Sequence, residues 1–165
     1  MSLKQNVEVV PLGCFYPGKG MEVCPVQTRH NPLESPGIYS QETTLITLPS
    51  GIVNNLYVHQ HQTDQLFCVR GSAVIVVWQN HEYEYILLTE NNPVLVKIPP
   101  SIPHGSVNLT TKSCTLLNSI VRYAPSSSGD YRSVKLPQNY DLEAIRQLFL
   151  NVRESVVSTQ SYQKA

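Results

Sequence analysis

Hydrophobic and polar residues alternate in short runs along most of this chain, and turn residues separate the runs. The 12 prolines and 8 glycines recur throughout the sequence. Period-2 alternation between such breaks is typical of strands in a sandwich or barrel, and an alternation of helices with parallel strands is not indicated. The expected strands are 43–48, 52–61, 66–69, 72–78, 83–88, 94–98, 106–109 and 114–122.

Two segments depart from this alternation. Residues 72–78 are apolar on both faces, as expected for a strand inside a two-layer core. Residues 142–157 carry apolar side chains at helical spacing after Asp141, a suitable N-cap, so we expect an amphipathic C-terminal helix whose apolar stripe faces the core.

The length of 165 residues fits one domain. Within it we distinguish an irregular, turn-rich N-terminal segment (1–40), a β-barrel core (41–125), and a loop followed by the C-terminal helix (126–165). The N-terminal segment is expected to wrap a sheet edge or to exchange with a second subunit.

Charge and composition narrow the classes of partner. Lys plus Arg equals Asp plus Glu, at 12 each, so no net charge attracts the chain to nucleic acid or to an anionic membrane. No charged-then-apolar leader and no membrane-length apolar run is evident, which favours a cytoplasmic protein. Cys68 and Cys114 lie in strand-like runs and are interpreted as small core residues.

Three histidines form the most informative pattern. His59 and His61 are two apart on the expected strand 52–61, so both imidazoles should face the same side. His104 follows a distant proline-rich turn, and three nitrogens from two strands can hold Zn, Fe, Mn or Ni with open positions for water or substrate. Gln65 is either a fourth ligand or a hydrogen-bonding neighbour, and Asp64 should face the other way on a regular strand.

These motifs resemble those of the cupins. The His-x-His motif continues through Gln65 to Gly71, and Pro99, Ser101, His104 and Asn108 are similar to the second cupin motif. The resemblance implies a jelly-roll β-barrel, a metal site at His59, His61, Gln65 and His104, and a homodimer. Gln65 stands where the family usually has Glu, and Ser101 where it has Gly.

A narrower resemblance covers residues 41–125. Segments 51–58, 98–105 and 123–125 are similar to the dTDP-4-dehydrorhamnose 3,5-epimerases. Their catalytic residues do not carry over, because Tyr57 stands at the position of the general base, Asn54 at the arginine, Asp64 at the lysine and Leu117 at the tyrosine acid. Only His104 of the family's polar site remains, which favours the fold over the epimerase mechanism.

Three functions therefore stay open. The leading hypothesis is a metal-binding cupin enzyme acting on a small molecule, with a carbohydrate-related substrate as one option. The second is a sugar-nucleotide epimerase or isomerase relative that uses His59 or His61 as a relocated base, with Tyr57 the remaining catalytic candidate; the third is a non-catalytic ligand-binding cupin. The candidate substrate-binding residues are Tyr57, Phe67, Arg70, Asn108 and Tyr123.

Overall fold

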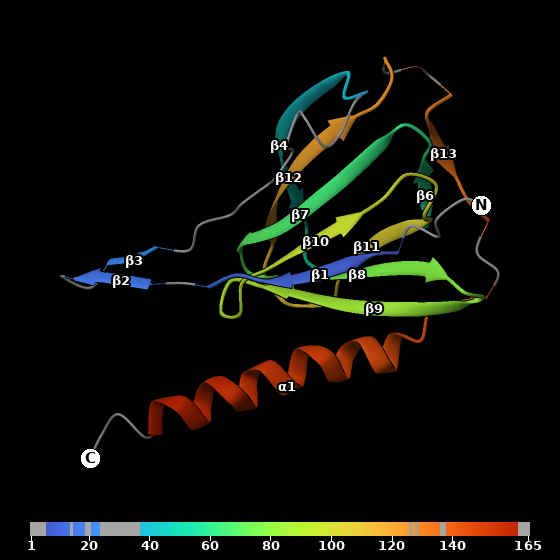
Figure 1. Ribbon diagram of the computed structural model, residues 1–165. Helices are drawn as coiled ribbons and strands as arrows, with labels where there is room; N and C mark the ends of the chain where they lie inside the picture. The colour runs from blue at the N-terminus through green and yellow to red at the C-terminus, as the bar shows by residue number, and fades with distance from the viewer. Residues whose placement is uncertain are drawn as a thin grey trace.

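The computed structural model stacks two antiparallel β-sheets and covers the second sheet with one helix (Figure 1). It describes residues 6–13, 15–18, 21–23, 37–125, 127, 129–135 and 138–161. The described strands form separate sheets rather than a closed barrel, so the expectation of an all-β jelly-roll architecture with a C-terminal helix is confirmed in the form of a two-sheet sandwich.

The first sheet has five strands in the order β1-β10-β7-β12-β4. Their bounds are Glu8–Pro11 (β1), Val94–Ile98 (β10), Gln62–Arg70 (β7), Cys114–Arg122 (β12) and Ser40–Leu48 (β4). The long pairing of β12 with β4 aligns Cys114 with Leu48 and Arg122 with Ser40. All pairings are antiparallel, and the order is far from the order along the chain, so residues distant in sequence become neighbours.

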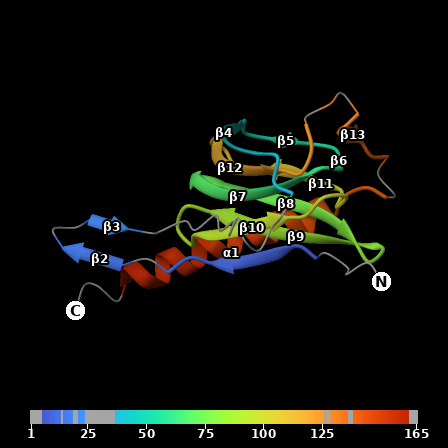
Figure 2. The ribbon, with the colours of Figure 1, turned by 45° about the horizontal axis from the view of Figure 1, so that its top comes forward.

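The second sheet runs β13-β6-β11-β8-β9, and β5 also pairs with β11. The bounds are Tyr131–Ser133 (β13), Tyr57–His59 (β6), His104–Asn108 (β11), Ser72–Gln79 (β8), Glu82–Thr89 (β9) and Ile52–Val53 (β5). The strands β2 (Phe15–Gly18) and β3 (Met21–Val23) pair only with each other and extend away from the two sheets (Figures 1 and 2).

Strand β8 contributes to two hydrophobic cores because alternate side chains point to opposite faces of a sheet. Ala73, Ile75 and Val77 pack between the two sheets. Val74 and Val76 pack on the other side, against the helix α1 (Leu142–Ser161). This confirms the two-sided apolar pattern read from residues 72–78.

Helix α1 begins at the predicted cap. The Asp141 carboxylate accepts hydrogen bonds from the backbone N–H groups of Glu143 (3.1 Å) and Ala144 (2.9 Å), which have no partner inside the helix. Ile145 is completely buried, and Leu148 and Phe149 pack beside it against the second sheet. The predicted core-facing stripe is therefore confirmed over residues 142–149, and the side chains of Val152 and Val156 lie outside the part of the helix whose side chains the structure describes.

Two local predictions differ from the structure. The expected strand 52–61 is wrong as one continuous strand: it is divided into β5 and β6, and the register against β11 shifts by one residue between Val53, which is opposite Val107, and Tyr57, which is opposite His104. The N-terminal segment, expected to be irregular, contains β1, β2 and β3, and β1 completes the edge of the first sheet next to β10.

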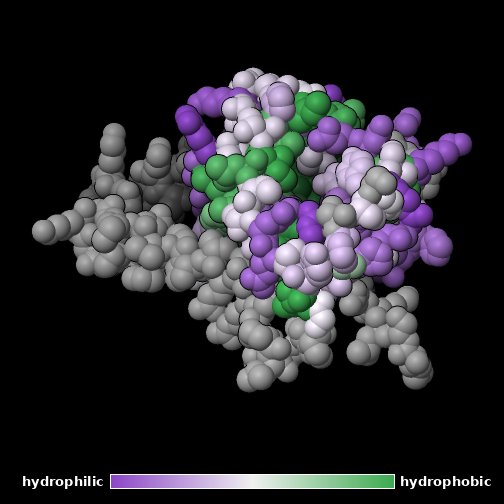
Figure 3. Space-filling view, turned by 90° about the horizontal axis from the view of Figure 1, so that it is seen from above, coloured by the Kyte–Doolittle hydropathy of each residue, from purple (hydrophilic) through white to green (hydrophobic). Residues whose placement is uncertain are grey.

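The surface of the described residues carries both hydrophobic and hydrophilic side chains (Figure 3). Viewed from above, hydrophobic patches lie among hydrophilic side chains (Figure 3). Leu45 on β4 is among the most exposed of the large apolar side chains, at 69%. No helix in the described part of the chain combines the length and the apolar character needed to cross a membrane.

Candidate active site

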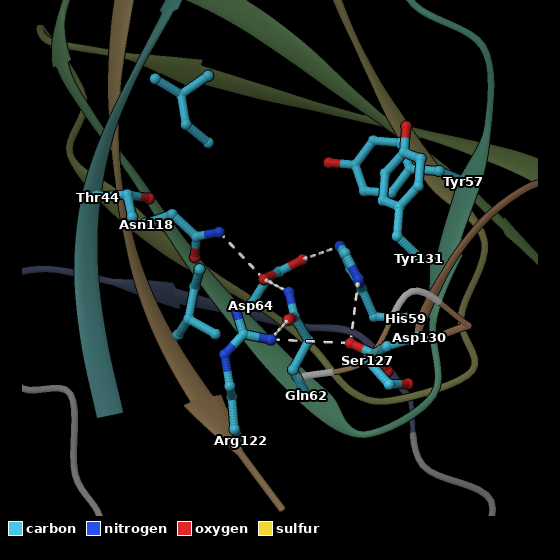
Figure 4. Close-up of a pocket in the computed structure, with 12 residues that line it drawn as sticks. Thr44, Tyr57, His59, Gln62, Asp64, Asn118, Arg122, Ser127, Asp130 and Tyr131 are labelled. Carbon is cyan, nitrogen blue, oxygen red and sulfur yellow. Dashed lines mark hydrogen bonds and ion pairs between the residues drawn. The ribbon is translucent and has the colours of Figure 1, made fainter. Parts of the chain in front are cut away.

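A pocket of about 300 Å³ opens between the two sheets. Side chains reach it from β4, β12 and β7 on one side and from β6, β13 and the loop before β13 on the other (Figure 4). The lining residues are Thr44, Ile46, Tyr57, His59, Gln62, Asp64, Asn118, Ile120, Arg122, Ser127, Asp130 and Tyr131. The polar lining residues and the hydrophobic core therefore both lie between the two sheets.

Asp64 lies at the centre of the polar network (Figure 4). Its Oδ1 accepts hydrogen bonds from the side-chain amides of Gln62 (2.7 Å) and Asn118 (3.0 Å), and its Oδ2 lies 3.1 Å from His104 Nε2. Burial alone raises the pKa of Asp64, but the hydrogen bond and charge of His104 and the hydrogen bond from Asn118 outweigh it and lower the pKa. The carboxylate is therefore ionised at neutral pH.

His104 is held at both ring nitrogens. Nδ1 lies 2.9 Å from the Ile102 carbonyl oxygen, which can only accept, so this nitrogen donates. Nε2 faces the Asp64 carboxylate, which is another acceptor when ionised. A proton or a cation must lie between these two atoms, because two lone pairs at this distance repel each other.

His59 stands between two carboxylates without a close hydrogen bond to either. Its Nε2 is 3.8 Å from Asp64 Oδ2, and its Nδ1 is 3.7 Å from Asp130 Oδ2. Burial lowers the pKa of His59 below its ordinary 6.5, with the nearby carboxylates acting in the opposite direction. The imidazole is therefore neutral at pH 7 and able to accept a proton.

Asp130 fixes the turn that presents His59. Its Oδ1 accepts hydrogen bonds from the backbone N–H groups of Gln60 (3.0 Å) and His61 (2.9 Å), immediately after β6 ends. The side chain is 5% exposed, and its second oxygen also lies 3.7 Å from Arg122 Nη1. One carboxylate thus ties the end of β6 to the loop before β13.

Tyr57 and Tyr131 form an aromatic wall next to the histidines. Their rings stack with centroids 5.1 Å apart, and the Tyr57 ring meets His104 edge-on at 4.4 Å. Burial, followed by the charge of Asp64, strongly raises the pKa of Tyr57. The Tyr57 hydroxyl is therefore protonated at neutral pH and can donate a hydrogen bond.

Arg122 supplies the positive charge of the pocket. Nη1 donates to the Gln62 amide oxygen and Nη2 donates to Glu42 (2.8 Å). Three carboxylates, Asp64, Asp130 and Glu42, lie on or beside this pocket, so Arg122 is balanced by the protein itself. Any anionic ligand group must compete with these contacts.

The predicted metal residues divide into two sets. His59 and His104 come together, with ring centroids 5.9 Å apart. His61 is exposed, because the strand ends at His59 and the bend at Gln60 breaks the period-2 alternation. Gln65 is buried on the opposite face of β7, since consecutive strand residues point to opposite faces and Asp64 occupies the pocket side. The expected orientations of these two residues were therefore wrong: Asp64, and not Gln65, faces the histidines.

The predicted substrate residues are mostly elsewhere. Tyr57 lines the pocket, whereas Phe67 shares the outer face of β7 with Gln65, and Arg70 is exposed at the far end of that strand. Asn108 is buried and bonds the carbonyl oxygens of Leu48 and Lys112, so it shapes a loop. The Tyr123 hydroxyl bonds Thr63 and is absent from the pocket lining.

A divalent ion fits part of this cluster. One ligand atom each from His59, Asp64 and His104 lie within 4.8 Å of one another. Two imidazoles and a carboxylate suit Zn and the other first-row metals named from the sequence. The Ile102 carbonyl fixes the His104 ring with Nε2 toward the cluster, the orientation that metal-binding histidines commonly receive from such a partner.

Solved structures of known proteins share this architecture. A sugar 3,4-ketoisomerase, QdtA, from Thermoanaerobacterium thermosaccharolyticum is 20% identical and superposes with a TM-score of 0.56, covering 85% of this chain and 93% of its own. A dTDP sugar isomerase from Desulfovibrio desulfuricans G20 gives 17% identity and a TM-score of 0.61, with 81% and 86% covered. The dTDP-4-dehydrorhamnose 3,5-epimerase from Sulfolobus tokodaii gives 18% and 0.62, with 84% and 85% covered.

The chain has the RmlC-like cupin fold. This confirms the fold resemblance read from residues 41–125. No protein-family model and no curated protein matches the chain. At these identities the likeness establishes the fold, and the chemistry depends on the residues in the pocket.

Several pocket residues escaped the sequence interpretation. Gln62, Asn118, Arg122, Asp130 and Tyr131 line the pocket and are not among the candidate site residues expected from the sequence. The alternation of β12 offered a usable signal, because Asn118 and Arg122 share the face of the core residues Cys114 and Leu116. For Asp130, which precedes a short strand in a loop, the sequence carried no comparable signal.

Proposed function

We propose that the protein is a sugar-nucleotide epimerase or isomerase in which His59 moves a proton at a carbon next to a ketone. The observation that carries this proposal is the His59 imidazole beside the Tyr57 ring in one pocket, with ring centroids 5.3 Å apart; burial lowers the pKa of His59 and raises the pKa of Tyr57. The sugar-nucleotide class is supported by the fold neighbours, described as a sugar 3,4-ketoisomerase, a dTDP sugar isomerase and a dTDP-sugar epimerase.

The residues suit distinct parts of such a reaction. His59 accepts the proton from the carbon next to the carbonyl, since its lowered pKa keeps the lone pair available at neutral pH. Tyr57 donates a hydrogen bond to the oxygen that gains negative charge. Asp64 and Asp130 lie on either side of the imidazole and stabilise the imidazolium that forms.

The function is tested by proton exchange. The substrate is TDP-4-keto-6-deoxyglucose, the ligand of a QdtA variant, incubated with the protein in deuterated water. We expect NMR to show solvent deuterium in the sugar. Deuterium at C3, or at C3 and C5, of a 4-keto sugar indicates proton exchange or epimerisation at those carbons. Deuterium at C4 of a 3-keto product indicates ketoisomerisation, because the proton removed from C3 is then replaced at C4.

In the variant His59→Asn the rate of deuterium exchange should fall by about 100-fold or more, the usual contribution of a general base. His61→Asn is the matched control, because His61 is exposed and outside the pocket lining; its rate should stay within about twofold of wild type, well below a general-base effect. No exchange by the wild type with a panel of 4-keto sugar nucleotides, or equal rates for the two variants, would contradict the proposal.

A second candidate function, a metal-dependent cupin enzyme, rests on the His59–Asp64–His104 cluster. In it, these three residues hold a divalent ion, which when bound polarises a carbonyl or activates water. Asn118 and Gln62 orient the carboxylate through Oδ1 and leave Oδ2 directed at the histidines.

Metal analysis of the purified protein and thermal shifts with Zn, Mn, Fe and Ni test this candidate. We expect about one ion per chain and a raised melting temperature that His104→Ala abolishes and His61→Ala retains. If no added metal changes the melting temperature, the metal candidate is wrong, while the exchange experiment, repeated in EDTA, still decides the proton-transfer proposal.

A further inference from the structure

A second reactive group lies in the hydrophobic core, at the opposite end of β7 from Asp64. Cys68 on β7 and Cys114 on β12 are 2% and 0% exposed, and their sulfurs are 3.7 Å apart in a thiol–thiol hydrogen bond. Both belong to the hydrophobic cluster between the sheets, and the pocket lining does not include them. Neither the proposed reaction nor the candidate metal site uses them.

The turn after β7 brings the two sulfurs together. Gly71 has a φ of +82°, and a Cβ built on it would lie 2.8 Å from the Ser113 carbonyl oxygen and 3.2 Å from Cys114 Cα. The Gly71 carbonyl in turn accepts a hydrogen bond from the Cys68 thiol at 3.2 Å. The close backbone approach allowed by glycine therefore fixes both cysteines from the same turn.

The geometry is near that of a disulfide. A disulfide has an S–S length of about 2.05 Å, so the sulfurs must approach each other by about 1.7 Å. The strands that carry them are already hydrogen-bonded neighbours, and their register shifts between Thr115 and Leu116, next to Cys114. Cys68 is opposite Leu116, two residues from Cys114, so forming the bond requires rotation of both side chains and adjustment of the backbone at this irregularity.

The two thiols are chemically unequal. Contact with Cys68 lowers the pKa of Cys114, and the same contact raises the pKa of Cys68. The residues next to the pair along the chain are exposed: Val69, Arg70, Lys112 and Ser113. A small oxidant needs only a local opening of this turn to reach the sulfurs.

We propose that Cys68 and Cys114 form a reversible disulfide when the protein meets a hydroperoxide. The Cys114 thiolate attacks one peroxide oxygen, the O–O bond breaks, and for hydrogen peroxide the other oxygen leaves as water after protonation. The Cys68 sulfur then attacks the resulting sulfenic acid, forms the S–S bond and releases a second water. Two thiols are oxidised and one peroxide is reduced, and a dithiol such as dithiothreitol reverses the step.

The experiment uses the full chain and a Cys14→Ser/Cys24→Ser double variant. The chain contains four cysteines, so the double variant keeps only Cys68 and Cys114. The fully reduced proteins are treated with hydrogen peroxide, the excess peroxide is removed, and thiols are titrated in denaturant. Peptide mapping by mass spectrometry identifies the linked residues.

In the double variant we expect both thiols to disappear with a mass loss of about 2 Da, the two hydrogens removed on disulfide formation. The mapped product should join the Cys68 and Cys114 peptides, and dithiothreitol should restore both thiols. The oxidised form should melt several degrees higher, because the disulfide restricts the conformations open to the unfolded chain. Retention of both thiols, oxygen addition without a cross-link, or a link only between two molecules would overturn the proposal.

Discussion

Replacing Asp130 by Ala removes a carboxylate that bonds two consecutive backbone N–H groups. Asp130 Oδ1 holds Gln60 and His61 at 3.0 and 2.9 Å, and the side chain is 5% exposed. Within the described residues, no other acceptor is seen for these two backbone N–H groups. The substitution therefore affects the turn between β6 and β7 and, through it, the placement of His59.

The expected loss follows from hydrogen bonds with an ionised acceptor. Each contributes about 1.5–3 kcal/mol to stability, so two give about 3–6 kcal/mol. Gln60 and His61 are exposed residues, and water can partly replace the lost acceptor. We therefore expect a loss near the lower end, about 3 kcal/mol, or about 6–12 °C in melting temperature for a chain of this size.

Asp130→Asn separates the hydrogen bonds from the charge. The amide oxygen can still accept from Gln60 and His61, so this variant should lose less than half as much free energy of unfolding as Asp130→Ala. Urea denaturation of both variants and wild type measures the difference, with equal m-values showing that the unfolding transition is comparable. If the alanine variant unfolds at the wild-type urea concentration, Asp130 does not hold this turn.

Three further predictions concern separate parts of the structure. Burial lowers the pKa of His59 below 6.5 in the folded state, so the unfolded chain takes up the proton first as the pH falls. The free energy of unfolding should therefore decline below about pH 6.5. Urea denaturation across this pH range should show a weaker decline for His59→Gln than for the wild type. Gly105→Ala places a Cβ 2.9 Å from the Asn55 carbonyl oxygen and 3.1 Å from the Tyr140 hydroxyl. This crowding should lower the free energy of unfolding, measured by chemical denaturation, by about 1–3 kcal/mol. An unchanged denaturation midpoint would show that the neighbouring atoms move aside freely. Asp141→Ala should cost about 1 kcal/mol through loss of the helix cap, with thermal melting as the measurement and Asp141→Ser as the control that retains an acceptor.

The fold was largely accessible from the sequence because strand alternation continues over long, paired strands. The expected 94–98 and 114–122 agree with β10 and β12 residue by residue. The two-sided apolar run 72–78 correctly indicated a strand between two cores. What the pattern could not give was the pairing order, in which β7 lies between β10 and β12, since pairing depends on contacts between residues distant along the chain.

The site was only half accessible, for a local reason. His59 and His61 share a face only if the strand continues through Gln60, and the two bonds from Asp130 to that bend end the strand at His59. The next strand begins at Gln62 and places Asp64 toward the pocket, which puts Gln65 on the other face. Two hydrogen bonds to one carboxylate, which lies 70 positions from Gln60 and 69 from His61 along the chain, thus accompany the change from the expected ligand set to the observed one.

The contact between His104 and Asp64 connects the two candidate functions. With Nδ1 committed to the Ile102 carbonyl, Nε2 meets an ionised carboxylate oxygen at 3.1 Å, so the pair needs a positive centre between its atoms. A proton between them makes this contact a hydrogen bond, and the charge of His104 acts to lower the pKa of His59. A metal ion would instead displace that proton and take the His59 lone pair as a ligand. The same three side chains therefore cannot serve as metal ligands and leave His59 free as a base at the same time, so metal that binds there should suppress proton exchange.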